Sequence, residues 1–492
     1  MKLCLINHDF KYELEKLIRI FFPFEKIEFC ETIECDSLCA VTRLTEGETA
    51  LAEACLYIED KQFSKTLEVE KSAEDFEKEC ELKLALALYE CFLEATAYIP
   101  GWGILTGVRP AKLFSRLRKS MGEEAAEDYF KNVLRVSDKK LSLCKETVSG
   151  EDKITSLSKR DSFSLYISIP FCPTRCSYCS FVSHSVDKAK KLIPQYVDLL
   201  CREIKETAER AKNANLRLET IYIGGGTPTA ISEMEIDKIM ESVEESFDLS
   251  NLREYTVEAG RPDTVTREKL EVIKKHGATR ISINPQTMSN SVLEAIGRRH
   301  TAEETVAAFL LAREVGFDNI NMDLIAGLPT DTFESFKETV EKVIALNPES
   351  VTVHSLSMKR SSRLNITGAL YDTEIGKIAS QMVDFARERL SSEGIVPYYM
   401  YRQSKTVGNL ENVGYSKKGY ECLYNVYIMD ETHTILACGA SAVTKLREPD
   451  GNYIERIFNF KYPYEYIDRF EEILSRKEGI VKFYDKFGGG NK

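Results

Sequence analysis

The sequence predicts an α/β protein built on a six-stranded partial (β/α)6 barrel of the TIM type. From Asp161 onward, short apolar segments alternate with amphipathic helical segments, an order typical of a parallel sheet. Six such units can be counted, whereas a complete (β/α)8 barrel needs two more. We therefore expect the barrel at residues 156–373, after an α+β N-terminal domain at 1–155 and before a small α+β C-terminal domain at 374–492.

The first barrel strand shows the clearest pattern. Over residues 163–169, apolar side chains alternate with Ser164, Tyr166 and Ser168, as expected for a strand with two different faces. The other strands are expected at 219–223, 255–258, 280–283, 320–325 and 350–356. The helices between them are expected at 188–211, 233–245, 264–276, 301–315 and 333–346.

The flanking segments follow other patterns. Residues 1–70 suggest short strands joined by turns, and helical periodicity follows over 72–98 and 111–146. The polar stretch 147–159 is a candidate linker. Beyond the barrel we expect a helix at 374–392, strand-like segments up to Lys445 and a last helix after Pro463.

Composition excludes several classes of protein. Hydrophobic residues make up 43% and charged residues 29%, as in ordinary soluble proteins. A net charge of -12 does not suit a nucleic-acid binder or a protein that docks on anionic lipid. We expect no signal peptide and no membrane span, and hence a cytoplasmic location in which the 14 cysteines stay reduced.

One cysteine group has ligand-like spacing. Cys172, Cys176 and Cys179 form a C-x3-C-x2-C loop directly after the first barrel strand, and thiolates are the ligands of iron–sulfur clusters. Three ligands would leave one corner of a [4Fe–4S] cluster open. The alternatives are three buried thiols, or a zinc site completed by His184. A second group, Cys30/Cys35/Cys39, is irregularly spaced and is interpreted as ordinary thiols.

This loop, with Tyr178 before its last cysteine, resembles the signature of the radical S-adenosylmethionine (SAM) superfamily. Residues 166–172, 224–229 and 323–329 resemble the oxygen-independent coproporphyrinogen III dehydrogenase family. Residues 101–110, together with Tyr401-Arg402-Gln403, resemble its HemZ-like branch. The resemblance covers roughly residues 85–470.

The resemblance implies a [4Fe–4S] cluster on the three cysteines and one or two molecules of SAM. Close backbone approach is the physical reason for the glycines, although a plain turn would explain them equally well. Salt bridges or helix caps are the alternative for the charged residues. The cofactor-binding residues that the resemblance implies are Tyr166, Tyr178, Gly225, Gly226, Thr227, Glu258, Gln286, Arg298, Asp323, Ser357 and Val443.

The implied activity is the decarboxylation of two coproporphyrinogen III propionates to vinyl groups by a 5′-deoxyadenosyl radical, giving protoporphyrinogen IX. It implies an electron donor such as flavodoxin or ferredoxin, and a monomer. One departure matters, because Phe181 stands where the decarboxylating type has a fourth cysteine, and haem-trafficking members carry Phe there. A haem chaperone, or another tetrapyrrole-modifying radical SAM enzyme, is therefore the alternative.

A substrate with four carboxylates needs cations. Lys359, Arg360 and Arg363 follow the sixth strand, and a solvated loop is their alternative reading. Arg402 stands beside the tyrosines at 398, 399 and 401, which could either line a flat pocket or pack in a core. The sequence assigns no role to residues 1–155.

Overall fold

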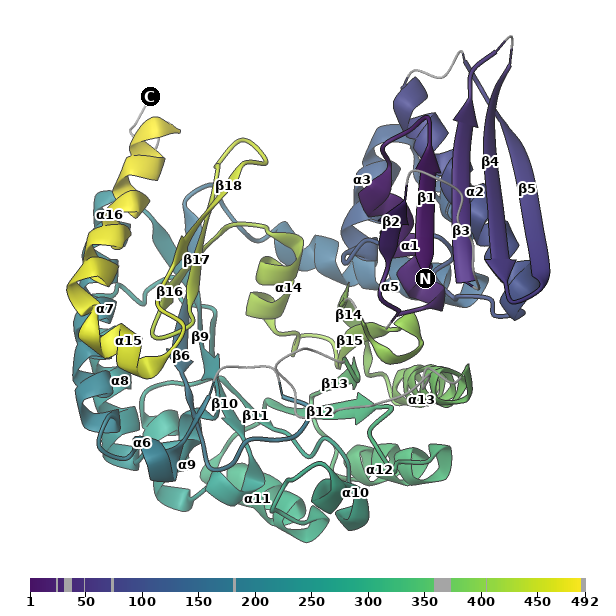
Figure 1. The fold of residues 1–492 in the computed structure, drawn as a ribbon. Coiled ribbons are helices and arrows are strands. Elements are labelled where there is room, and N and C mark those ends of the chain that lie inside the picture. The colour runs from purple at the N-terminus through teal and green to yellow at the C-terminus, as the bar shows by residue number, and fades with distance from the viewer. Residues whose placement is uncertain are drawn as a thin grey trace. The chain divides into compact units, whose positions relative to one another are not determined.

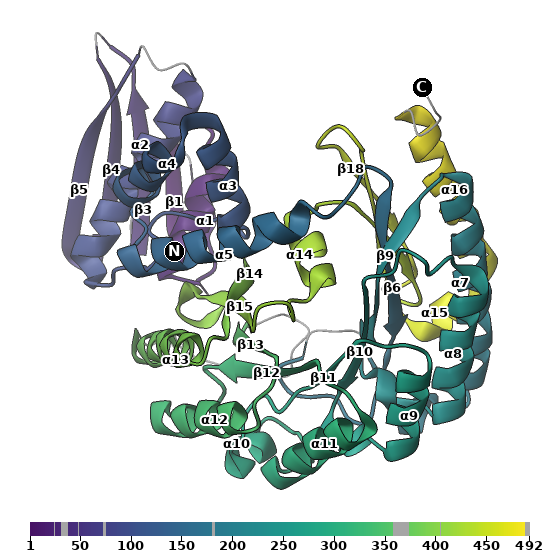
Figure 2. The same cartoon turned by 180° about the vertical axis from the view of Figure 1, so that it is seen from behind.

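The computed structural model describes residues 1–23, 25–30, 38–47, 49–71, 75–179, 183–357, 373–403 and 405–487. The chain divides into two compact units. The first comprises Met1–Lys145, Ile366–Lys377 and Arg402–Glu411, and the second comprises the rest. Figures 1 and 2 show both units from opposite sides.

The first unit contains a five-stranded sheet in the order β2-β1-β3-β4-β5. Strand β1 is parallel to β2 and β3, and β3, β4 and β5 are antiparallel neighbours. Helix α2 packs on β4 and β5, because alternate residues of β4 are buried on that face. The bounds are β1 Lys2–Ile6, β2 Glu28–Cys30, β3 Leu38–Thr45, β4 Ala50–Ile58, β5 Lys61–Val69 and α2 Phe76–Thr96.

Two expectations for this part of the chain were wrong. Helix α1 (Lys11–Phe21) lies within the stretch predicted to contain only strands, and it buries Leu14, Leu17 and Ile18 at helical spacing. Helix α5 (Asp138–Thr155) runs through most of the predicted linker, because Thr147, Val148 and Glu151 are buried. The predicted helix 111–146 is divided into α3 (Pro110–Met121), α4 (Glu123–Asp128), a π-helical turn and α5.

The expectation that the cysteines stay reduced is also wrong. Parallel pairing of β1 with β2 sets Cys4 opposite Cys30, with Cα atoms 4.7 Å apart, and the two form a disulfide. Cys39 is disulfide-bonded as well, and Cys35 lies outside the described residues. Strand register brings these thiols together, and sequence spacing does not reveal it.

The second unit confirms the barrel prediction. Its sheet has the order β14-β15-β13-β12-β11-β10-β9-β6-β16-β17-β18, in which the six strands from β6 to β13 are parallel neighbours. Figure 1 shows helices α7–α12 on the outside of the arc. The strands are β6 Ser162–Ile169, β9 Arg217–Gly225, β10 Glu254–Gly260, β11 Arg280–Ile283, β12 Ile320–Ala326 and β13 Ser350–Ser355. The helices are α7 Ile193–Asn213, α8 Glu233–Ser246, α9 Arg267–Lys275, α10 Asn290–Ala295, α11 Ala302–Val315 and α12 Phe333–Ala345.

The C-terminal segment extends this sheet at both ends. Strand β15 is antiparallel to β13, and β16 is parallel to β6. Strand β6 thus has a neighbour along each edge and is an interior strand of the sheet, and all but one of its residues are buried. The segment comprises α13 Thr373–Ser392, β14 Val396–Arg402, β15 Glu411–Ser416, α14 Leu423–Asp430, β16 Thr434–Cys438, β17 Val443–Arg447, β18 Ile454–Phe458, α15 Pro463–Asp468 and α16 Phe470–Lys486. Within the described ranges, no helix is long and apolar enough to cross a membrane.

Candidate functional site

The candidate site lies where the parallel barrel strands end. The loop after β6 carries the three cysteines, and the segments after β9, β10 and β11 reach toward it through hydrogen bonds. In barrel enzymes this end of the strands carries the chemistry, because the loops there can vary without disturbing the sheet. Each predicted residue is therefore located relative to this end of the barrel strands.

The cysteine loop is fixed by a buried arginine that the sequence reasoning missed. Arg261, just after β10, donates from Nη1 to Thr174 Oγ1 at 2.7 Å and to the Thr174 carbonyl at 3.3 Å. Its Nε and Nη2 donate to the Asp263 carboxylate at 2.9 and 2.6 Å. Because Arg261 is only 3% exposed, these bonds are shielded from water and hold the loop firmly.

Arg298 fixes the other side of the loop. It is buried, donates from Nη1 to the Asn284 carbonyl at 2.6 Å and from Nε to the Tyr178 hydroxyl at 3.2 Å. Ser177 adds a backbone bond to the Ile296 carbonyl at 3.1 Å. In this structure Arg298 therefore connects the cysteine loop to the segments that flank α10.

The three thiols lie on this anchored loop and are not in disulfides. Cys176 is buried, while Cys172 and Cys179 are half-buried, and Thr227 donates to the Cys172 sulfur at 3.5 Å. Burial raises the pKa of Cys172. Among the described residues, no group of three or more His, Cys, Asp and Glu side chains is arranged to hold a metal ion, so ligation by the three thiols stays a prediction.

The glycines after β9 approach the cysteine loop itself. Gly226 N donates to the Ile169 carbonyl, and Thr227 N donates to the Phe171 carbonyl, both at 2.8 Å. A Cβ atom on Gly226 would lie 2.5 Å from the Phe171 oxygen, and Gly225 has a φ of +110°. Glycine is required here because two backbones pass in direct contact.

Glu258, at the end of β10, is a half-buried carboxyl that accepts a 2.5 Å hydrogen bond from the Tyr222 hydroxyl. Burial, and then the charge of Asp323, raise the pKa of Glu258 to about 7, against the opposing effect of the Tyr222 bond. A carboxyl with this pKa can hold or release a proton near neutral pH.

The pKa of Asp323 is shifted in the opposite direction. Burial would raise its pKa, but interactions with His354 and Asn321 leave the pKa below the usual value. Asn321 Nδ2 donates to Asp323 Oδ1 at 2.7 Å, and His354 Nε2 lies 3.9 Å from Oδ2. Gln286 has a left-handed backbone conformation, with a φ of +68°. The backbone N of Gln286 donates to the Asp323 carbonyl on β12 at 2.9 Å. The site thus contains one charged carboxylate, Asp323, and one carboxyl, Glu258, whose pKa lies near neutral pH.

A stack of tyrosines lines the same region. The rings of Tyr166, Tyr222 and Tyr424 form a triangular cluster, with centroids 4.5 Å apart for Tyr222–Tyr424, 6.1 Å for Tyr166–Tyr424 and 6.3 Å for Tyr166–Tyr222. Buried Glu254 accepts from the backbone N of Leu423 at 2.7 Å and of Tyr424 at 3.3 Å, which fixes the start of α14. Only Tyr166 of this stack was predicted, because the other two come from distant parts of the chain.

Of the other residues that the sequence singled out, two can be placed in the structure and four lie outside the described ranges. Ser357 follows β13 and is half-buried, and Val443 begins β17, where it pairs with Phe458. The side chains beyond the described residues are Phe181, Lys359, Arg360 and Arg363.

The side chains of Arg402, Tyr398 and Tyr399 are buried within the protein's own structure. The buried Arg402 guanidinium donates to the carbonyls of Leu105, at 2.5 Å, Gly107 and Asn409, so it has a structural role. Tyr398 and Tyr399 belong to a buried core cluster and are 2% and 4% exposed. For these two tyrosines, core packing is the correct alternative.

Comparison with known proteins gives consistent results. A family model described as "Radical SAM superfamily" matches residues 166–343. The chain is 42% identical over 380 residues to the oxygen-independent coproporphyrinogen-III oxidase-like protein HemZ of Bacillus subtilis, covering 76% of each chain. It is 30% identical over 317 residues to the heme chaperone HemW of the same organism, covering 61% of this chain and 77% of HemW.

Among solved structures, the coproporphyrinogen III oxidase HemN from Escherichia coli aligns with a TM-score of 0.49 and 22% identity. The alignment covers 65% of this chain and 71% of HemN.

Proposed function

Because the chain belongs to the radical SAM superfamily, in the branch of oxygen-independent coproporphyrinogen III oxidase-like proteins, we propose that it decarboxylates coproporphyrinogen III without oxygen. In the proposed reaction each of two propionate side chains gives one hydrogen atom to a 5′-deoxyadenosyl radical, releases one carbon dioxide and passes one electron to an external acceptor. Each propionate thereby becomes a vinyl group, and the product is protoporphyrinogen IX. The observation that carries the proposal is the anchored three-cysteine loop at the carboxyl ends of the barrel strands, beside a carboxyl whose pKa is about 7.

Members of this superfamily use a [4Fe–4S] cluster and SAM, and the residues present fit both groups chemically. Cys172, Cys176 and Cys179 supply three thiols outside disulfides, the donors that iron–sulfur clusters require, and would hold the cluster. When bound, the two groups supply one-electron reductive cleavage of a carbon–sulfur bond and the hydrogen abstraction that starts the reaction.

The protein's own contribution is to bind, orient and exclude water. Asp323, kept charged by His354 and Asn321, would accept hydrogen bonds from ribose hydroxyls or an ammonium group. Glu258 would hold a proton near neutral pH while Tyr222 fixes its Oε1 atom. Gly225, Gly226 and Thr227 keep the β9 end against the cysteine loop, so that both face the bound groups together.

The tyrosine stack provides an apolar wall with flat faces. Tyr166 and Tyr222 are half-buried, so each keeps part of its surface accessible. Such faces suit the planar pyrrole rings of a tetrapyrrole and displace water from the reacting propionate. We also propose that flavodoxin or ferredoxin delivers the electron and that the chain works as a monomer in the cytoplasm.

The test is an anaerobic assay with reconstituted protein, dithionite, SAM and coproporphyrinogen III, followed by chromatography of the porphyrins. We expect protoporphyrinogen IX and cleaved SAM from the unchanged chain, and neither from Cys176→Ser. The matched control is Cys201→Ser, which alters another free thiol on α7 and should retain activity. Unchanged coproporphyrinogen with the active cofactor-cleaving protein would reject decarboxylation.

A haem chaperone is the second candidate, favoured by the similarity to HemW and by Phe181 in the cysteine loop. It predicts cofactor binding and tight haem binding with no change in the porphyrin. Titration with haem, measured by its absorption spectrum in the same preparation, separates the two. Strong haem binding without decarboxylation would establish the chaperone instead.

A further inference from the structure

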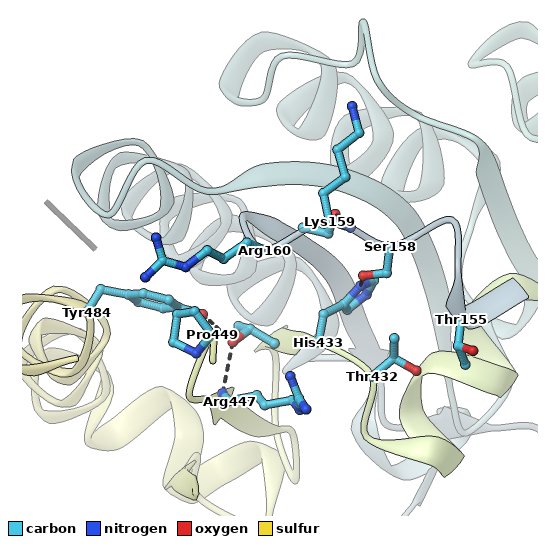
Figure 3. Close-up of a pocket in the computed structure, with 11 residues that line it drawn as sticks. Thr155, Ser158, Lys159, Arg160, Thr432, His433, Arg447, Pro449 and Tyr484 are labelled. Carbon is cyan, nitrogen blue, oxygen red and sulfur yellow. Dashed lines mark hydrogen bonds between the residues drawn. The ribbon is translucent and has the colours of Figure 1, made fainter. Parts of the chain in front are cut away.

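A second pocket lies at the opposite end of the first barrel strand. It has a volume of about 280 Å³ and surrounds the starts of β6 and β16 (Figure 3). Since β6 runs from Ser162 to Ile169, roughly 23 Å of strand separates this pocket from the cysteine loop. The lining residues are Thr155, Ser158, Lys159, Arg160, Ser162, Thr432, His433, Thr434, Arg447, Pro449 and Tyr484.

The charge of this pocket contrasts with that of the protein. The chain carries a net charge of -12, yet no acidic residue lines the pocket. The Arg447 side chain forms no ion pair within the described residues; Nη1 donates only a long 3.5 Å bond to the Glu448 carbonyl. Arg160 pairs with Asp450 at 2.7 Å, but both side chains are largely exposed at the rim. Lys159 points away from the other lining side chains (Figure 3).

The wall behind Arg447 is a preorganised hydrogen-bond network. His433 is buried, with Nδ1 2.7 Å from Ser158 Oγ and Nε2 2.8 Å from Ser164 Oγ. Burial lowers the pKa of His433 to about 3, and the charges of Arg447 and two further arginines lower it as well. The ring is therefore neutral and adds no positive charge of its own to the pocket.

We propose that this pocket binds a small phosphate-bearing anion, either inorganic phosphate or a phosphomonoester. A guanidinium without a carboxylate partner offers a bidentate contact to phosphate oxygens. The hydroxyls of Thr155, Thr432 and Ser158 also line the pocket, but they already bond to the Asp152 carbonyl, the Asp430 carboxylate and the His433 ring, so Arg447 is the main contact. Thr434 and Tyr484 are already hydrogen-bonded to each other, which fixes the floor of the pocket. Its place at the strand starts separates it from the reaction at the strand ends.

The probe is inorganic phosphate, with binding to the whole chain measured by isothermal titration calorimetry and by ³¹P line broadening. We expect saturable one-site binding that Arg447→Gln weakens by about tenfold or more, since a charge-assisted contact is lost. Arg202→Gln is the matched control, because it removes an exposed arginine on α7, outside the pocket. Arg447→Lys should retain part of the affinity.

Three results would overturn the proposal: no saturable binding, equal binding by Arg447→Gln, or equal affinity for acetate, which would indicate a site for any anion. Glucose 6-phosphate distinguishes the two sources, because a phosphomonoester site accepts it and a site closed around free phosphate does not. Far-UV circular dichroism and SAM cleavage should be unchanged in Arg447→Gln. The circular dichroism spectrum shows whether the variant is folded, and SAM cleavage shows whether the proposed reaction is intact, so a loss of phosphate binding can be distinguished from both.

Discussion

Removing the buried arginine beneath the cysteine loop should cost more stability than removing any surface arginine. In Arg261→Ala, the carboxylate of Asp263 loses two charge-assisted bonds, and Thr174 loses its bonds to Nη1. Breaking a fully buried pair from one side costs about 3–5 kcal/mol. Because the Asp263 side chain is still 23% exposed, we expect about 3 kcal/mol, the lower end of that range.

Equilibrium urea unfolding followed by far-UV circular dichroism measures the loss. The single tryptophan, Trp102, lies in the other compact unit, so its fluorescence serves as an internal reference. Arg267→Ala, which breaks an exposed pair with Glu314, should cost no more than about 1 kcal/mol. Adding Asp263→Ala to Arg261→Ala should recover part of the loss, since no charge is then left unpaired. Equal stabilities of Arg261→Ala and Arg267→Ala would refute this reasoning.

Three further predictions concern Glu258, His433 and Gly226. Between about pH 4.5 and 7 the native Glu258 carboxyl keeps a proton that the unfolded chain releases. The free energy of unfolding should therefore fall by roughly 3 kcal/mol as the pH rises through this range, and Glu258→Gln should remove this pH dependence. His433 stays neutral in the folded protein, whereas in the unfolded chain it takes up a proton below about pH 6.5. The free energy of unfolding should therefore fall by up to roughly 5 kcal/mol as the pH drops from 6.5 toward 3, and His433→Asn should abolish this pH dependence. Urea titrations across pH test both, and unchanged slopes would contradict the burial argument. Gly226→Ala puts a Cβ 2.5 Å from a carbonyl oxygen and should reduce iron uptake, whereas Gly107→Ala, which meets nothing closer than 3.9 Å, should bind iron normally.

The sequence predicted the barrel well because each barrel strand carries its own local signal. Segments such as 280–283 and 320–325 are short, alternate polar with apolar residues and are bounded by helical periodicity, and the structure has β11 and β12 there. Helix α1 was missed because Leu14, Leu17 and Ile18 form a narrow stripe among charged residues. The linker prediction failed because polar residues such as Glu151 are buried by tertiary packing.

The candidate site was only partly predictable. Motif spacing identified the cysteine loop and the glycines, but the partners that position them come from long-range contacts. Arg261 lies 87 residues from Thr174, and Tyr424 stacks on Tyr222 from a separate segment. The substrate-binding role predicted for Arg402 was wrong, because its guanidinium donates to three backbone carbonyls. A cation beside aromatic residues in the sequence gives no local sign of such contacts. The disulfide at Cys4 depends on strand register in the same way.

The proposed chemistry depends on one loop supplying three ligands to one cluster. Iron and sulfide should be measured on anaerobically reconstituted protein, together with the absorption near 400 nm that iron–sulfur clusters produce. We expect about four iron atoms per chain, and loss of both the iron and SAM cleavage when Cys172, Cys176 or Cys179 is changed to serine. A colourless protein, or serine variants that keep their iron and cleave SAM at the original rate, would contradict it.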